Sequence, residues 1–166
     1  MLYIFGGLPG TGKSTLSQSL ARDRQCVHLR IDTIEHTLRQ AGSLIAGSEG
    51  YSVAYRLAED NLRLGLSVVA DSVNPLQITR MAWREVALRV REPFVEIEII
   101  CSDVAEHQHR VETRSTDISG FKLPTWEAVV NRGYEPWNGE QIVIDTAGQT
   151  VEQSVTALLQ SLKRVA

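Results

Sequence analysis

Short apolar runs alternate along this chain with longer stretches in which apolar residues recur every three or four positions. The short runs are typical of strands buried on both faces, and the longer stretches are typical of helices packed by one face. The expected strands are residues 2–5, 26–30, 66–71, 94–101 and 141–145. Because strand and helix alternate, the pattern predicts one α/β domain, residues 1–166, with a parallel sheet and helices on both faces.

The expected helices follow these strands and are separated by polar segments. They cover residues 14–24, 33–41, 52–64, 76–90, 103–114, 125–134 and 151–162. Ser102 is expected to cap the fifth helix, and Thr150 with Gln153 forms a capping box for the last. Residues 42–50 are rich in glycine and serine and are expected to be a mobile loop. The polar residues 115–124 have the composition of a closing lid.

The fourth expected strand departs from the apolar pattern, because Glu96 and Glu98 share one of its faces. A carboxylate is costly to bury without a partner. We therefore expect these two side chains to be exposed near the lower end of the strand.

The first expected strand leads directly into a glycine-rich segment. Its sequence, GLPGTGKS at residues 7–14, matches the G-x-x-x-x-G-K-[ST] pattern of a P-loop. In such loops the backbone N–H groups and the following helix N-terminus converge on phosphates. Since Lys13 can reach the outer phosphates and the Ser14 hydroxyl can bind magnesium, the segment predicts a nucleotide phosphate site. The expected contacts are Gly7, Pro9, Gly10, Thr11, Gly12, Lys13, Ser14 and Thr15.

Aspartates also fall at the carboxyl ends of three other expected strands, at the same edge of the sheet as the P-loop. They are Asp32, Asp71 and Asp145. In parallel sheets ligands bind at this edge. Asp71 occupies the position of a Walker B carboxylate, which holds magnesium directly or through water, with a turn beside Pro75 as the alternative.

Composition narrows the function classes. The chain has 17 Lys and Arg against 20 Asp and Glu, a net charge of −3, which disfavours a nucleic-acid partner. No apolar run approaches ~20 residues, so no membrane span is expected, and the opening strand leaves no room for a signal peptide. Cys26 and Cys101 are expected as free thiols in a reducing cytoplasm. The histidines predict no site, because His107 and His109 point to different faces of a helix.

Taken together, these segments make the whole chain resemble the small P-loop kinases. This group includes chloramphenicol phosphotransferase, zeta toxins, gluconate kinase and the kinase domain of phage polynucleotide kinase. The matching segments are Gly7–Ser14, Arg30-x-Asp32, Asp71-x-x-Asn74 and Arg110-x-x-x-Arg114. The resemblance implies a five-stranded sheet in the order 2-3-1-4-5, ATP and Mg²⁺ as cofactors, and a small lid at about residues 110–124.

The resemblance also implies roles for three residues. Asp32 would be the general base that orients the acceptor hydroxyl and takes its proton, with a helix N-cap as the alternative. Arg110 and Arg114, one helical turn apart and facing the same way, would clamp adenine and the transferring phosphate. A solvated face paired with Glu106 is the alternative for either arginine.

Residues 145–149, DTAGQ, spell the D-x-x-G magnesium and switch motif of GTPases. In those proteins a guanine-reading N-K-x-D follows downstream, and this chain has none. In the resembling kinases this loop borders adenine through backbone groups, which places Thr146 and Gly148 at the nucleotide.

The sequence therefore favours an ATP- and Mg²⁺-dependent phosphotransferase that moves the γ-phosphate to a hydroxyl of a small molecule. A nucleotide-dependent switch or binding module without an acceptor is the second hypothesis. A 5′-hydroxyl nucleic-acid kinase is the third, and the acidic balance of the chain disfavours it.

The acceptor is expected between the second and third strands. The second helix, the loop 42–50 and the region of Tyr51, Tyr55 and Arg56 would line it, with at least one tyrosine packed instead of binding. The position that aligns with the acceptor-phosphate arginine of a nucleic-acid kinase holds Glu35. A carboxylate there would repel a phosphate, which favours a neutral or cationic acceptor.

Overall fold

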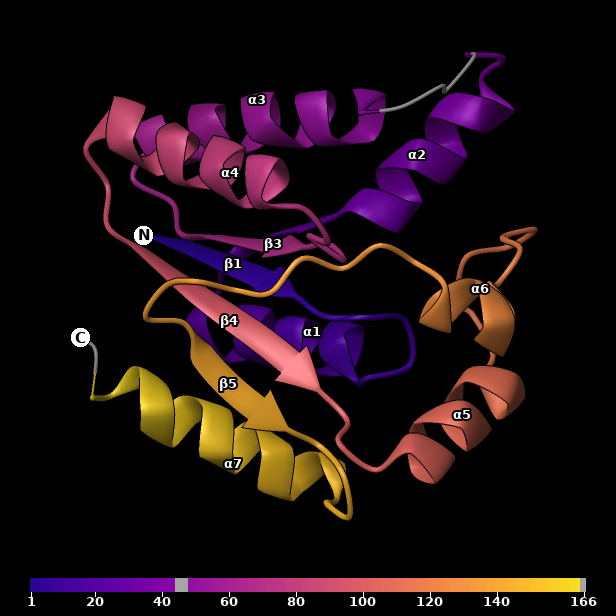
Figure 1. Ribbon diagram of the computed structural model, residues 1–166. Coiled ribbons are helices and arrows are strands. Elements are labelled where there is room, and N and C mark those ends of the chain that lie inside the picture. The colour runs from indigo at the N-terminus through magenta and orange to yellow at the C-terminus, as the bar shows by residue number, and fades with distance from the viewer. Residues whose placement is uncertain (44–47, 165–166) are drawn as a thin grey trace.

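A parallel five-stranded sheet forms the centre of the computed structural model (Figure 1), which describes residues 1–43 and 48–164. The strands are β1 (Leu2–Gly6), β2 (Val27–Arg30), β3 (Val68–Asp71), β4 (Phe94–Ile100) and β5 (Ile142–Asp145). They lie in the order β2-β3-β1-β4-β5, and every neighbouring pair is parallel. The predicted fold class and strand order are confirmed.

Two layers of helices cover the two faces of the sheet (Figure 1). Their members are α1 (Lys13–Arg24) and α7 (Val151–Leu162) on one face, and α3 (Glu49–Arg63) and α4 (Gln77–Val90) on the other. Side chains along β1 point alternately to the two faces of the sheet, so this strand contributes to the core beneath each helix layer. Leu2 and Ile4 pack in the core beneath α3 and α4, whereas Tyr3 and Phe5 pack in the core beneath α1 and α7. The central strand is therefore apolar throughout.

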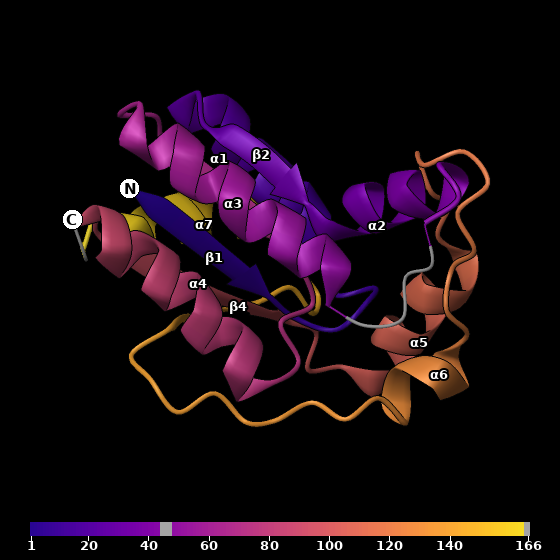
Figure 2. The same ribbon diagram turned by 90° about the horizontal axis from the view of Figure 1, so that it is seen from above.

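The remaining helices stand beyond the carboxyl ends of the strands (Figure 2). They are α2 (Ile31–Gln40), α5 (Val104–Thr113) and α6 (Trp126–Val130). The start of β1 and the end of α7 lie at the opposite end of the molecule (Figure 2). The sheet edge that carries the P-loop is thus surrounded by helices that do not belong to either layer.

Helix capping differs from the expectation at α5. Its cap is Asp103, whose Oδ1 accepts a hydrogen bond from the Glu106 N–H at 2.9 Å, so the prediction of a Ser102 cap was wrong. Both residue types cap helices well, and the Ser102 N–H is engaged elsewhere, with the Asp145 carboxylate at 3.0 Å. The capping box at Thr150 is confirmed.

Two expected boundaries also shift. Within the expected loop 42–50, residues 44–47 lie outside the described residues, and α3 already begins at Glu49. The helix expected at 125–134 is shorter, because α6 ends at Val130. The residues that follow form a long connection to β5.

Glu96 and Glu98 are not exposed at the end of β4, as the sequence suggested. Glu96 is only 8% exposed, and the Arg84 guanidinium of α4 binds both of its carboxylate oxygens at 2.8 Å. Glu98 accepts a hydrogen bond from the Tyr134 hydroxyl at 3.1 Å. The connection 131–141 and α4 therefore supply the partners that allow two carboxylates in an inner strand.

A buried arginine fixes this connection to the sheet edge. Arg80 of α4 is 1% exposed and donates hydrogen bonds to the main-chain oxygens of Asn74 and Pro136, each at 3.0 Å. Its guanidinium carbon lies 4.5 Å from the centre of the Trp137 ring. The turn after β3 is thereby held in place next to the P-loop.

Candidate active site

The P-loop joins β1 to α1 and takes its shape from glycines with positive φ angles. Gly7 has a φ of 141° and Gly10 a φ of 90°, values that residues with a side chain rarely adopt. A Cβ atom on Gly7 would lie 2.3 Å from the Ile99 oxygen, and one on Gly10 would lie 2.5 Å from a Val111 methyl group. The loop therefore needs glycine at both positions for conformation and for space.

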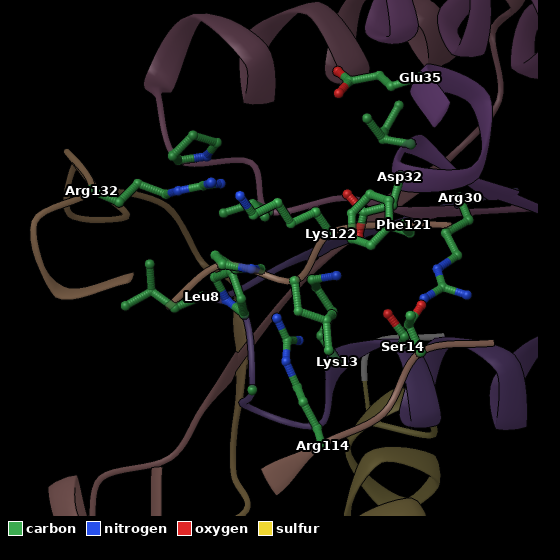
Figure 3. A pocket seen from close by; sticks show the side chains of 18 of the residues that line it. Leu8, Lys13, Ser14, Arg30, Asp32, Glu35, Arg114, Phe121, Lys122 and Arg132 are labelled. Carbon is green, nitrogen blue, oxygen red and sulfur yellow. The ribbon is translucent and has the colours of Figure 1, made fainter. Parts of the chain in front are cut away.

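A cavity of about 1120 Å³ opens above the P-loop, between α2, α6 and the loop that follows α5 (Figure 3). This volume exceeds the roughly 300–1,000 Å³ of a typical small-ligand pocket. Most residues predicted from the sequence line it, namely Pro9, Gly10, Gly12, Lys13, Ser14, Thr15, Asp32, Arg110 and Arg114. The other predicted residues lie outside the lining, namely Gly7, Thr11, Asp71, Thr146 and Gly148. The cavity has room for a nucleotide phosphate chain and a second small molecule.

Lys13 and Asp71 form a buried ion pair at the base of this site. Lys13 Nζ lies 2.6 Å from Asp71 Oδ1, and the two residues are 7% and 1% exposed. Burial raises the pKa of Asp71 and is the largest single influence, but the charge and hydrogen bond of Lys13 and the neighbouring His28 together outweigh it and hold the pKa well below its usual range. Asp71 Oδ2 has no hydrogen-bond partner in the described part of the chain. The carboxylate thus faces the P-loop, and the alternative of a turn beside Pro75 is wrong.

His28 was missed by sequence reasoning. Its Nε2 lies 3.6 Å from Asp71 Oδ2, just beyond hydrogen-bond distance, and 3.1 Å from Ser17 Oγ. The pairing of β2 with β3 brings the two residues together across a long stretch of sequence. The only signal in the sequence is a polar residue inside an expected strand.

Asp32 is the second residue of α2, because Arg30 is the N-cap of that helix. No side chain caps this helix end, so the alternative of an Asp32 N-cap is wrong. The Asp32 carboxylate points into the cavity (Figure 3). Among the described side chains none forms a hydrogen bond or ion pair with it. Its oxygens are therefore available to a ligand in the cavity.

Arg110 and Arg114 differ in their contacts. Arg110 donates to Thr146 Oγ1 at 2.8 Å and to the Thr146 main-chain oxygen at 2.9 Å, and it pairs with Glu106. Arg114 lies past the end of α5 with an extended backbone, and its side chain reaches the cavity beside Lys13 (Figure 3). Burial lowers the pKa of Arg114. Both arginines therefore line the same cavity, but only Arg110 is bound to the loop after β5.

The loop after β5 is tied to the P-loop. Thr146 Oγ1 donates to the Thr11 main-chain oxygen at 2.9 Å, and the Gly148 N–H donates to Glu106 Oε2 at 2.8 Å. The Asp145 carboxylate accepts hydrogen bonds from two main-chain N–H groups, both at 3.0 Å. The D-x-x-G residues therefore shape a loop beside the phosphate site, and the carboxylate has a structural role.

The lid loop, residues 114–125, rests on α2. Arg30 Nη1 donates to Asp117 Oδ1 at 2.7 Å, and His36 Nε2 donates to the Ser119 main-chain oxygen at 2.9 Å. The Phe121 ring meets the His36 ring edge-on at 5.9 Å between centres. These contacts close the lid loop over the side of the cavity that contains α2.

The side of the cavity formed by α2 and α3 carries a paired carboxylate and one tyrosine. Glu35 Oε2 lies 3.0 Å from Arg39 Nη2. The Tyr51 hydroxyl lines the same side and accepts a hydrogen bond at 3.3 Å from the main-chain N–H of the turn after β3. Tyr55 instead packs edge-on against Trp83, at 4.6 Å between ring centres. The expectation that at least one tyrosine packs is confirmed.

Two cations of the cavity lining had no place in the sequence predictions. Lys122 of the lid loop and Arg132, which follows α6, both point into the cavity (Figure 3). Arg56, which was expected near the acceptor, lies outside the lining and is 79% exposed. Isolated cations in polar segments carry no sequence signal that distinguishes a cavity from open surface.

The structure also bears on membrane spans, metal-binding groups and the two cysteines. Across residues 1–43 and 48–164, no helix has the length and apolar character needed to cross a membrane. The same residues contain no group of three or more His, Cys, Asp or Glu side chains that could hold a metal. Cys26 and Cys101 are free, and burial raises the pKa of both thiols.

Comparison with known proteins places this geometry in a family. The family model described as an AAA domain matches residues 2–133. The chain belongs to this AAA domain family. Among curated relatives of this AAA domain protein, the adenylyl-sulfate kinase of Oceanobacillus iheyensis is 29% identical over 180 residues, which cover 96% of this chain and 82% of the relative.

Solved structures share the fold of this AAA domain protein. A gluconokinase from Sinorhizobium meliloti 1021 superposes with a TM-score of 0.70 at 17% identity, over 99% of this chain and 92% of the other. The Mycobacterium tuberculosis APS kinase CysC, in complex with AMPPNP and APS, gives a TM-score of 0.68 at 17% identity, over 98% and 96% of the two chains. With the family match and the curated relatives, these findings make the protein a P-loop kinase, a phosphotransferase with an alcohol group as acceptor.

Proposed function

We propose that this AAA domain protein uses ATP and Mg²⁺ to transfer the γ-phosphate to a hydroxyl of a small molecule. The observation that carries the proposal is the Asp32 carboxylate, which has no ion-pair partner among the described residues and lies in the same cavity as Lys13 and Arg114 (Figure 3). Phosphoryl transfer to an alcohol needs cations around the phosphate and a base at the attacking hydroxyl. A switch or binding module would need no base at that place.

The phosphate side of the mechanism follows from the P-loop. Its N–H groups and Lys13 bind the outer phosphates of ATP, and Arg114 adds a second positive charge beside Lys13. Negative charge grows on the equatorial oxygens of the transferring group, so fixed cations stabilise the transition state more than the ground state.

The acceptor side of the mechanism depends on Asp32. Its carboxylate accepts a hydrogen bond from the acceptor hydroxyl and takes the proton as the new oxygen–phosphorus bond forms. The broken bond leaves its electron pair on ADP. Asp32 thus orients the nucleophile and removes its proton.

The residues present fit a magnesium ion. The Ser14 hydroxyl lines the cavity, and Asp71 keeps one carboxylate oxygen, Oδ2, without a hydrogen-bond partner among the described residues. Magnesium at a nucleotide commonly uses one or two protein ligands together with phosphate oxygens and water, so a larger cluster is not required. When bound, the ion supplies positive charge to the β- and γ-phosphates.

Arg110 has a separate role in this proposal. Its bonds to Thr146 and its pair with Glu106, which also holds the Gly148 N–H, fix the loop after β5. We propose that this loop borders the adenine and that Arg110 maintains its shape. The γ-phosphate is then left to Lys13 and Arg114.

The names of the relatives supply candidate acceptors. Adenylyl sulfate follows from the curated relatives and gluconate from a structural neighbour. The narrower resemblance to chloramphenicol phosphotransferase, zeta toxins and polynucleotide kinase stays a prediction, and it adds chloramphenicol and 5′-hydroxyl oligonucleotides to the set.

The test measures ATP consumption with each of these compounds, for the wild type, Asp32→Asn and Asp60→Asn. Asp60 is an exposed carboxylate of α3 outside the cavity and provides the matched control. We expect one small molecule to raise ATP consumption in the wild type and in Asp60→Asn only. ATP binding with no acceptor-dependent turnover would favour a binding module, and a response to oligonucleotides alone would favour a nucleic-acid kinase.

A further inference from the structure

The positively charged side chains that line the cavity outnumber the negatively charged ones. Four of its cations have carboxylate partners, in the pairs Lys13–Asp71, Arg30–Asp117, Arg39–Glu35 and Arg110–Glu106. Within the described ranges of the chain, the lining also includes four charged residues without an ion-pair partner, namely Asp32, Arg114, Lys122 and Arg132. Three unpaired cations therefore stand against one unpaired carboxylate.

The transferring phosphate accounts for only one of these three cations. Arg114 lies beside Lys13 at the P-loop, whereas Lys122 and Arg132 lie away from Ser14 and point toward one another (Figure 3). Lys122 belongs to the lid loop and Arg132 follows α6, so the two side chains approach the cavity from different segments. Like charges that converge repel each other, and an anion between them reverses the sign of the interaction.

From this arrangement we propose that the acceptor carries an anionic group, which binds between Lys122 and Arg132 while its hydroxyl faces Asp32. Phosphate, sulfate and carboxylate groups share the required chemistry, because each accepts charge-assisted hydrogen bonds from both an ammonium and a guanidinium. The inference rests on the proposed kinase function and names the substrate class of that site.

Glu35 does not oppose an anionic acceptor. The expectation of a neutral or cationic acceptor treated Glu35 as a free carboxylate, but Arg39 lies 3.0 Å from its Oε2. At distances longer than the pair itself, the two charges largely cancel. The proposal therefore departs from the expectation based on Glu35 alone.

A binding experiment with inorganic sulfate tests the anion site directly. The intact protein is first saturated with magnesium and AMPPNP, which fills the P-loop. Sulfate is then titrated by calorimetry into the wild type, the Lys122→Gln/Arg132→Gln variant and an Arg22→Gln/Lys163→Gln control. Arg22 and Lys163 are exposed cations outside the cavity, so the control removes the same charge.

We expect sulfate to bind the wild type and the control equally, and to bind the Lys122→Gln/Arg132→Gln variant about tenfold or more weakly. The three proteins should bind AMPPNP alike. Equal sulfate affinity in all three proteins, or no sulfate binding to the wild type, would overturn the proposal.

Turnover with matched compounds identifies the kind of anion. The pairs are glycerol 3-phosphate and glycerol, gluconate and glucose, and adenylyl sulfate and adenosine. We expect phosphorylation of an anionic member, with its KM raised about tenfold in Lys122→Gln/Arg132→Gln and the KM for ATP unchanged. Preference for the neutral member would overturn the proposal. If nothing is phosphorylated but sulfate still separates the variants, the anion site stands and the kinase function fails.

Discussion

The phosphate side and the acceptor side of the cavity are built in different ways. On the phosphate side most charged groups are bound: Lys13 and Asp71 form a buried pair, and Arg110 is bonded to Thr146, whereas Arg114 has no ion-pair partner among the described residues. On the acceptor side, Asp32 and Lys122 have no hydrogen-bond or ion-pair partner among the described residues. The fold therefore fixes the phosphate contacts in advance and leaves the acceptor contacts to be completed by a ligand.

This difference follows from the elements that carry each side. The P-loop and the loops after β3 and β5 extend directly from strands of the sheet, and main-chain hydrogen bonds hold them together. The acceptor side is formed by α2, the lid loop and the segment after α6 that carries Arg132. These parts of the chain lie outside the two helix layers (Figure 2). A segment outside the core can change its side chains at little cost to folding, which suits the part of the site that selects a substrate.

The largest expected effect tests the acceptor side. Asp32→Asn keeps the shape of the side chain but removes the base, so acceptor phosphorylation should fall by roughly 10²–10⁴-fold. Because Asp32 caps no helix, the melting temperature should stay close to that of the wild type. Calorimetric titration should give unchanged ATP affinity. Unchanged phosphorylation of a true acceptor would remove Asp32 from the mechanism.

The phosphate side is tested by Lys13→Ala. Loss of the ammonium removes positive charge where negative charge grows, so kcat should fall on the order of 10² or more. The measurement is turnover at saturating ATP and acceptor. Turnover near that of the wild type would show that the P-loop binds nucleotide without taking part in transfer.

Lys13→Ala should also lower the stability of the fold, whereas Asp32→Asn on the acceptor side should not. Removal of Lys13 leaves Asp71 buried and unpaired, which should cost about 3 kcal/mol of unfolding free energy at pH 7. The folded-state pKa of Asp71 is lowered, so the pair stabilises the fold above pH ~4, the unfolded value, and loses this effect as the pH falls. Urea unfolding at pH 7 and pH 3 should show the gap to the wild type narrowing at pH 3. A gap that does not depend on pH would contradict the role of the pair.

The phosphate side was also the part that the sequence could predict. The segment GLPGTGKS encodes both the backbone shape and the chemistry of the site in consecutive residues. The apolar runs predicted a parallel sheet, because strands buried on both faces have that pattern, and the resemblance to small P-loop kinases predicted its strand order. Even the corrected cap of α5 moved by a single residue, from Ser102 to Asp103.

The acceptor side could not be predicted in this way. Lys122 and Arg132 reach one cavity only through the path of the lid loop and α6. The pairing of Glu35 with Arg39 depends on side-chain conformation, which the sequence does not give. One residue of the phosphate side was missed for the same reason, because His28 reaches Asp71 through strand pairing. Contacts between segments decide this half of the site.

A smaller effect distinguishes the two arginines near α5. Arg114→Ala should lower kcat by roughly tenfold to a hundredfold, since the side chain lies beside Lys13 at the transferring phosphate. Arg110→Ala should mainly raise the KM for ATP, by a few-fold, because it loosens the loop held at Thr146. Steady-state kinetics of both variants decide the matter. Equal effects on kcat would restore the shared clamp expected from the sequence.

The smallest effect concerns the contact of the lid loop with α2. Arg30 holds Asp117, whose side chain is 69% exposed, so the pair is worth only a few tenths of a kcal/mol to about 1 kcal/mol. Asp117→Asn should therefore raise amide hydrogen exchange of residues 115–124 by about two- to fivefold at pH 7 and leave exchange of the P-loop unchanged. Asp60→Asn is the matched control and should change neither segment.

The Arg30–Asp117 pair also determines whether hydrogen exchange in the lid loop rises or falls with pH. The Arg30 hydrogen bond lowers the pKa of Asp117, so the contact persists above the usual aspartate pKa of ~4 and weakens as the pH falls below it. Lid exchange, corrected for the intrinsic rate, should thus rise in the wild type between pH 5 and pH 3 and stay flat in Asp117→Asn. A faster-exchanging P-loop in this variant would instead mean that the lid loop and the phosphate side open together, and the separation of the two sides would be lost.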